Sequence, residues 1–148
     1  MGWVVRPLDD PALDLIGTIP KELTLLSQLR LLDLSYSPNL EGSLPVPLSP
    51  YLQALYLEHT GVAGRLPSAL PALTDLRITF TPRMQQHGIP SFLHRLTKLE
   101  WLEWSQQAQA DSNGDTSTGT IPTELGHLTL LKGLCLGKSM VVPFWSFT

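Results

Sequence analysis

Apolar and polar residues alternate in five short segments of the chain, each with the order Leu-x-x-Leu-x-Leu or a close variant of it. The segments are LRLLDL from Leu29, LQALYL from Leu52, LTDLRI from Leu73, LEWLEW from Leu99 and LKGLCL from Leu131. Alternation with a period of two is typical of a β-strand that buries only one face. The sequence therefore predicts five short strands, each with one apolar face in a core and the intervening residues on the opposite face.

A second phrase, Gly-x-Ile/Leu-Pro, separates the predicted strands. It ends at Pro20, Pro45, Pro67 and Pro122, and a shortened form, HGIP, ends at Pro90. These prolines recur at roughly two dozen residues, with one longer interval, which is the spacing of a solenoid repeat. The glycine permits a sharp turn, and the proline fixes φ and favours entry into a helical turn. The phrase is thus predicted to form the corner of each coil.

The segments that follow three of the prolines have leucines three residues apart, which predicts short helical or 3-10 turns. These leucines are Leu23, Leu26 and Leu29, then Leu93, Leu96 and Leu99, then Leu125, Leu128 and Leu131. One repeat cannot bury its own apolar face, so neighbouring repeats are expected to stack around a continuous core.

The two phrases together resemble the leucine-rich repeat, from about Leu15 to Leu136. The Gly-x-Ile-Pro element resembles the plant subtype found in receptor-like kinase ectodomains and polygalacturonase-inhibiting proteins. The resemblance implies an α/β solenoid, a right-handed coil with a parallel sheet on its concave side and short helical or 3-10 turns on its convex side. At the positions of the family's usual asparagine ladder this chain has Ser37, Thr60, Thr81, Gln107 and Ser139.

We expect a single domain over residues 1–148. Its coils are a degraded first one at about 3–20, repeats at about 21–45, 46–67, 68–90 and 91–122, and an incomplete last one at 123–148. The fourth repeat carries a loop insertion at 105–118. Asp111, Asn113 and Asp115 in this insertion alternate as at the start of an EF-hand loop, but the glycine and glutamate which that motif needs later are absent. The composition therefore favours a connecting loop over a calcium site.

Composition narrows the classes of function. The chain has 148 residues, 43% of them hydrophobic, and a net charge of −3 without a basic stripe, which argues against nucleic-acid binding. No apolar run is long enough to span a bilayer. The single cysteine, Cys135, excludes an internal disulfide and a cysteine-based zinc site, and the four histidines have no metal-binding spacing. The compartment stays open: cytoplasmic for a complete chain, extracellular or membrane-attached for part of a receptor-like protein.

The outward strand positions are predicted to form a binding surface on the concave face. Two rows are expected, Leu31, Ala54, Asp75, Trp101 and Gly133, and beside them Asp33, Tyr56, Arg77, Glu103 and Cys135, with a third row of Ser35, Glu58, Thr79, Ser105 and Gly137. The candidate partner-binding residues are Asp33, Tyr36, Tyr56, Glu58, His59, Asp75, Arg77, Phe80, Trp101 and Glu103. Trp101, Tyr56 and Arg77 are the preferred anchors, because such residues often anchor interfaces. The alternative is that these are ordinary positions of a solvated sheet.

The sequence contains no nucleophile elbow and no phosphate-binding loop, and it predicts no catalytic residue, cofactor or metal. The resemblance implies a non-catalytic module that recognises a protein or peptide. An alternative is a fragment or ectodomain portion of a larger receptor-like protein or kinase whose catalytic domain lies outside this sequence. Nothing in the sequence points to a homo-oligomer.

Overall fold

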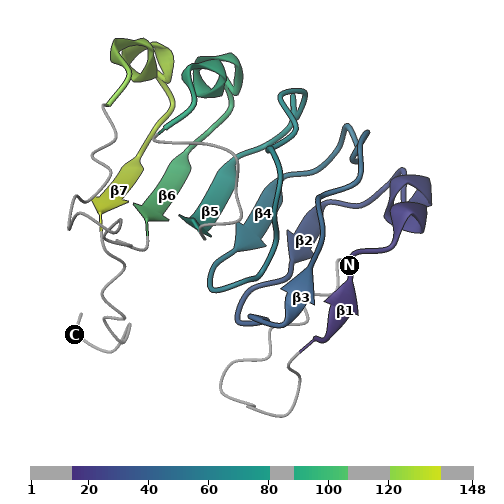
Figure 1. Cartoon of the computed structure of the whole chain (residues 1–148). Helices are drawn as coiled ribbons and strands as arrows, with labels where there is room; N and C mark the ends of the chain where they lie inside the picture. Colours follow the sequence, from purple (N-terminus) through teal and green to yellow (C-terminus); the bar gives the residue numbers. More distant parts are fainter. Residues whose placement is uncertain (1–14, 81–88, 107–120, 138–148) are drawn as a thin grey trace, which may run out of the picture.

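A computed structural model describes residues 15–80, 89–106 and 121–137, and its centre is a five-stranded parallel sheet (Figure 1). The strands are β2 (Leu31–Asp33), β4 (Ala54–Leu57), β5 (Asp75–Phe80), β6 (Trp101–Gln106) and β7 (Gly133–Gly137). They pair in the order β2-β4-β5-β6-β7, so each strand lies beside the strand of the next repeat. The five alternating segments of the sequence supply these five strands.

One face of the sheet forms the core. The strand register places five leucines side by side in a row that crosses all five strands: Leu32, Leu55, Leu76, Leu102 and Leu134. Leu55 and Leu102 are fully buried, whereas Leu134, in the edge strand β7, is 46% exposed. Trp104 takes the place of a core leucine and is buried, as its position in the pattern predicts.

The described parts of the connections contain three short 3-10 helices, and η2 packs beside η3 (Figure 1). They are η1 (Lys21–Leu25), η2 (Ser91–Arg95) and η3 (Thr123–His127). Each begins directly after a proline in extended conformation, with φ between −70° and −63°. The proline carbonyl accepts the first backbone hydrogen bond of the turn, for example from the Leu93 amide at 3.1 Å to Pro90. Leu93 and Leu125 anchor η2 and η3 in the core.

A second, smaller parallel ladder joins the corners of the first coils. It consists of β1 (Gly17–Thr18) and β3 (Leu40–Glu41), and a single bridge between Ser43 and Ala63 extends the same kind of contact to the next coil. The corner glycines explain the sharp change of direction, since φ is +90° at Gly42 and +86° at Gly64. A Cβ atom at Gly64 would also lie 2.6 Å from the Ser43 hydroxyl, so the corner has room only for glycine.

Two hydroxyl side chains stand where the family resemblance implies asparagine, and both are buried. Thr60 Oγ1 donates to the Leu57 carbonyl at 3.2 Å, and Ser37 Oγ donates to the Ser35 carbonyl at 3.5 Å. These bonds close turns within one coil and satisfy the buried hydroxyls. The other three ladder positions, Thr81, Gln107 and Ser139, lie outside the described residues, as do residues 107–118 of the insertion with Asp111, Asn113 and Asp115.

Candidate functional site

The face of the sheet opposite the leucine core, the outward face, carries the residues between the core positions. The register brings them into two rows across all five strands, in the order that the alternation predicts. The first row is Leu31, Ala54, Asp75, Trp101 and Gly133, and the second is Asp33, Tyr56, Arg77, Glu103 and Cys135. Side chains from different repeats therefore lie within reach of one another on this face.

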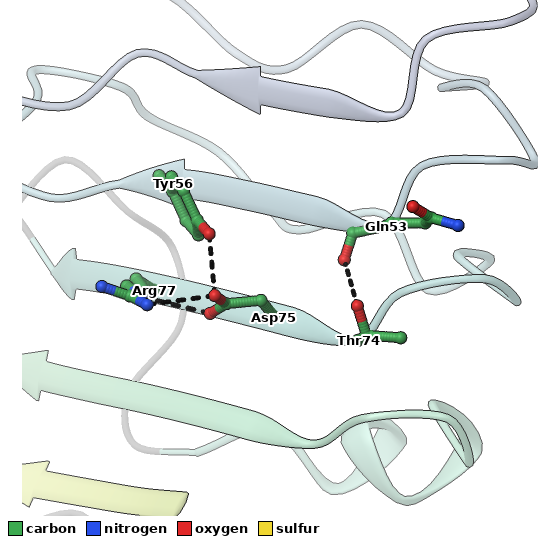
Figure 2. Close-up of polar contacts among 5 residues, drawn as sticks. All are labelled: Gln53, Tyr56, Thr74, Asp75 and Arg77. Carbon is green, nitrogen blue, oxygen red and sulfur yellow. Dashed lines mark hydrogen bonds and ion pairs between the residues drawn. The ribbon is translucent and has the colours of Figure 1, made fainter. Parts of the chain in front are cut away.

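The centre of the outward face is a hydrogen-bonded cluster around the carboxylate of Asp75 (Figure 2). The Tyr56 hydroxyl on β4 donates to Asp75 Oδ2 at 2.7 Å. Arg77, two residues along β5, donates from Nε to Oδ1 and from Nη2 to Oδ2, both at 3.1 Å. Residues two apart on a strand share one face, which is why Asp75 and Arg77 can pair in this forked geometry.

The guanidinium of Arg77 lies between two aromatic rings from the flanking strands. Its central carbon is 4.9 Å from the ring centroid of Tyr56 and 5.9 Å from that of Trp101. A planar guanidinium is suited to this position because it attracts the faces of aromatic rings while its edge bonds a carboxylate. Burial alone would lower the pKa of Arg77, but the hydrogen bonds and negative charge of Asp75 outweigh it and raise the pKa above the usual value. Arg77 is thus a fixed, permanent cation.

Trp101 lies flat against the neighbouring strand instead of projecting from the sheet. A Cβ atom at Gly133 would be 2.2 Å from Cε3 and Cζ3 of the Trp101 ring, so the indole occupies the space that a side chain on β7 would fill. Its Nε1 atom is buried and has no hydrogen-bond acceptor among the described residues. The absence of a side chain at Gly133 is therefore what allows Trp101 to pack in this orientation.

Carboxylates surround this cluster. Burial and then the nearby charge of Glu103 raise the pKa of Glu58 above its ordinary value, although Arg77 acts in the opposite direction. Asp33 Oδ1 accepts a hydrogen bond from the Ser35 amide at 3.0 Å, which orients this carboxylate at the end of β2. Asp33, Glu58 and Glu103 thus place three carboxylates near the cluster, and all three act on the hydroxyl of Tyr36.

Tyr36 and His59 form a second contact, just beyond the ends of β2 and β4. Their rings stack with centroids 5.3 Å apart and an interplanar angle of 26°. Tyr36 is 60% exposed. Its amide donates to the Glu58 carbonyl at 2.7 Å, which ties the two coils together at this point. Burial, followed by Glu58, Glu103 and Asp33, raises the pKa of Tyr36.

Two expectations for the outward face are wrong. Thr79 and Ser105, predicted in the third exposed row, are only 4% and 3% exposed. Ser105 Oγ donates to Thr79 Oγ1 at 3.0 Å and lies 3.4 Å from the Ile78 carbonyl, so these hydroxyls are satisfied inside the protein. Phe80 is the last residue of β5, and its backbone lies in register with that of Gln106.

The structure thus divides nine of the ten candidate residues, all but Phe80, into three groups. Tyr56, Asp75 and Trp101 each contact Arg77, Tyr36 and His59 form a separate stack, and Asp33, Glu58 and Glu103 contribute charge around both. From the sequence, Gly133 was assigned only a place in the first row of outward residues. The packing of the Trp101 indole over Gly133 was not predicted. The available signal was a glycine at an outward strand position directly opposite a tryptophan.

Other residues considered from the sequence form no site within the described ranges. Residues 15–80, 89–106 and 121–137 bring together no group of three potential metal ligands. Cys135 is an exposed free thiol on the outward face. His94 and His127, on η2 and η3, meet edge to face with ring centroids 6.3 Å apart. Within the same ranges, every helix is too short or too polar to span a membrane.

Comparison with known proteins supports the fold. No family model matches the chain. Among solved structures it is similar to the plant peptide hormone receptor RGFR1 in complex with RGF2, with a TM-score of 0.52 and 22% identity over 83% of this chain and 23% of that chain. The crystal structure of PEPR1-AtPEP1 gives a TM-score of 0.46, with 22% identity and the same coverage of both chains. The chain thus spans less than a quarter of the length of either receptor chain. Together with the parallel sheet of repeated strands, the likeness to RGFR1 shows that this chain has a leucine-rich-repeat fold.

Proposed function

We propose that this chain is a non-catalytic recognition module that binds a peptide, or an extended segment of a protein, across the outward face of its sheet. This face is the concave side in the solenoid that the repeat pattern implies. The contact surface would comprise the ten residues predicted from the sequence, with the cluster of Tyr56, Asp75, Arg77 and Trp101 at its centre.

The observation that carries the proposal is the fixed position of Arg77. It is bonded twice to Asp75 and lies between two aromatic rings, so its side chain is ordered before any partner arrives. A pre-ordered surface loses less conformational entropy on binding. Arg, Tyr and Trp are also the residue types that contribute most often to the binding energy of interfaces.

A peptide ligand is also supported by the fold. RGFR1 is a plant peptide hormone receptor, and the solved structure is its complex with RGF2. Function does not follow from fold alone, so the comparison favours the class of ligand and leaves its identity to experiment.

The test is selection of peptides from a displayed random library on the immobilised chain, followed by affinity measurement in solution. Arg77→Ala and Trp101→Ala should each weaken a selected peptide by about tenfold or more, as expected for central interface anchors. Lys98→Ala provides the control, because Lys98 is exposed in the turn before β6 and is not a member of the cluster. Circular dichroism would confirm that the variants are folded. Equal affinity for all four proteins would refute binding at the outward face.

A second candidate is a segment of a larger receptor-like protein or kinase, in which recognition serves a domain elsewhere in the protein. The comparison with RGFR1, of which this chain covers 23%, favours this candidate. Sequencing the full transcript tests it. Further Gly-x-Ile-Pro coils or kinase motifs in the same reading frame would support it, and a frame that codes for neither would refute it.

A further inference from the structure

Tyr36 and His59, just beyond the ends of β2 and β4, form what we call the rim of the outward face. Both adopt a backbone conformation that favours glycine. Tyr36 has φ of +58° and His59 has φ of +51°. The other residues with positive φ in the described part of the chain are glycines, for instance Gly42 and Gly64. A bulky side chain in this left-handed region costs conformational free energy that glycine would not incur. Backbone strain of this kind clusters at functional sites, so the presence of two large aromatic residues at these turn positions suggests a function for their side chains.

The strained positions present a stacked aromatic surface to solvent. Tyr36 follows β2 and His59 follows β4, so the same turn in two successive coils carries one ring each. The rings stack at 5.3 Å, and Tyr36 remains 60% exposed. The stack therefore covers one face of each ring and leaves much of Tyr36 available to a partner.

The electrostatic surroundings of this stack are negative. The carboxylates of Glu58, Glu103 and Asp33 all act on the Tyr36 hydroxyl, and together with burial, the largest cause, they raise its pKa. Among the described residues, the cation that acts on Tyr36 is Arg77, and its charge is already paired with Asp75 at 3.1 Å. An aromatic face in a negative field attracts a cation and disfavours phosphate or carboxylate groups.

The same sheet contains an internal example of this chemistry. Arg77 lies over the Tyr56 ring while Asp75, which accepts the Tyr56 hydroxyl proton, binds its guanidinium. At the rim, the exposed Tyr36 ring corresponds to Tyr56, and the carboxylates of Asp33 and Glu58 correspond to that of Asp75. Among the described residues, the cation that acts on Tyr36 is Arg77, which is already bonded to Asp75.

We propose that the stack of Tyr36 and His59 receives a lysine or arginine side chain of the bound peptide, with the Tyr36 ring as the cation–π surface and Asp33 and Glu58 as its counter-charges. This inference rests on the proposed peptide-binding function and specifies its ligand class, a basic peptide. The rim is the selective part of the surface, whereas the cluster around Arg77 is the fixed centre.

The decisive variant is Tyr36→Gly, because glycine removes the ring and suits the left-handed backbone, so the fold is retained. Tyr51→Ala is the matched control, since Tyr51 is 54% exposed and lies in the turn before β4, outside the stack. Random displayed peptides are selected on the wild-type chain and sequenced. Lysine or arginine should be enriched above its frequency in the library, and Tyr36→Gly should weaken a selected peptide at least about tenfold while Tyr51→Ala leaves it unchanged.

A double-mutant cycle locates the contact. The basic residue of a selected peptide is replaced by a neutral residue of similar length, and affinity is measured for the wild type and for Tyr36→Gly. The replacement should weaken binding to the wild type and have little effect on Tyr36→Gly, and added salt should weaken wild-type binding. Selected peptides without basic enrichment, or additive losses in the cycle, would overturn this inference and leave the proposed function standing. Failure to select any peptide would overturn both.

Discussion

The row of five leucines gives a sharp test of the packing, because the same residue occupies the same register position at different burial. Leu102 lies in the interior strand β6 and is fully buried, whereas Leu134 lies in the edge strand β7 and is 46% exposed. Leucine to alanine removes three carbons, worth about 2.4 kcal/mol of transfer free energy, and a closed cavity adds to this cost. For Leu102→Ala we expect a loss of about 2 to 5 kcal/mol in the free energy of unfolding.

The expected loss is much smaller at Leu134. About half of its surface is already in water, so roughly half of the transfer term applies, and solvent reaches the space left by the side chain. Leu134→Ala should therefore cost about 1 kcal/mol. Leu55→Ala and Leu76→Ala, with exposures of 0% and 1%, should follow Leu102.

Urea denaturation followed by far-ultraviolet circular dichroism measures these differences. The variants should have similar m-values, so that the shift of the midpoint reports stability alone. Equal losses for Leu102→Ala and Leu134→Ala would refute the assignment of β7 as a partly exposed edge. A negligible loss for both would refute the inward orientation of the whole row.

Three other predictions concern charge and close packing. Lys132→Met should change the free energy of unfolding by only about 0 to 1 kcal/mol in urea titrations, despite the 2.7 Å contact with Glu100. The two side chains are 71% and 44% exposed, so water screens the pair. A larger loss would show that the pair is structurally important. The pKa of Glu58 is raised above its ordinary 4.5, so the folded state binds protons more strongly than the unfolded chain, and the unfolding free energy should fall as pH rises above about 4.5. Glu58→Gln should reduce this decline and be more stable than the wild type at neutral pH, and parallel curves for the two proteins would contradict the assignment. Gly133→Ala should displace the Trp101 ring and alter the near-ultraviolet circular dichroism spectrum, at a cost of about 1 to 3 kcal/mol, and an unchanged spectrum would show that the indole does not lie on Gly133.

Much of the sheet could be predicted because its register is encoded in an alternation with a period of two. Once Leu55 and Leu76 are assigned to the core, Tyr56 and Arg77 must lie on the opposite face, and parallel stacking places them side by side. This reasoning is less reliable near the ends of the strands. Thr79 and Ser105 were expected on the exposed face, but their hydroxyls bond each other inside the protein, a pairing that depends on both strands extending to six residues.

The contacts within the candidate site were harder to predict because they depend on rotamers and on turns. Alternation places Trp101 on the outward face, but the direction of its indole depends on an empty space above Gly133 in the next repeat. A left-handed backbone such as that of Tyr36 and His59 is uncommon for residues other than glycine, so local propensity gave no sign of their stack.

In the five-stranded sheet, each strand pairs only with the strands of the adjacent repeats, and this affects how such a chain can evolve. An altered coil disturbs its two neighbours and leaves more distant ones untouched. Gene duplication or deletion of a whole coil would thus meet little structural resistance, whereas a frameshift inside one would misalign the apolar ladder. The outward face of the sheet would then become wider or narrower by whole strands, each adding or removing one residue from every row.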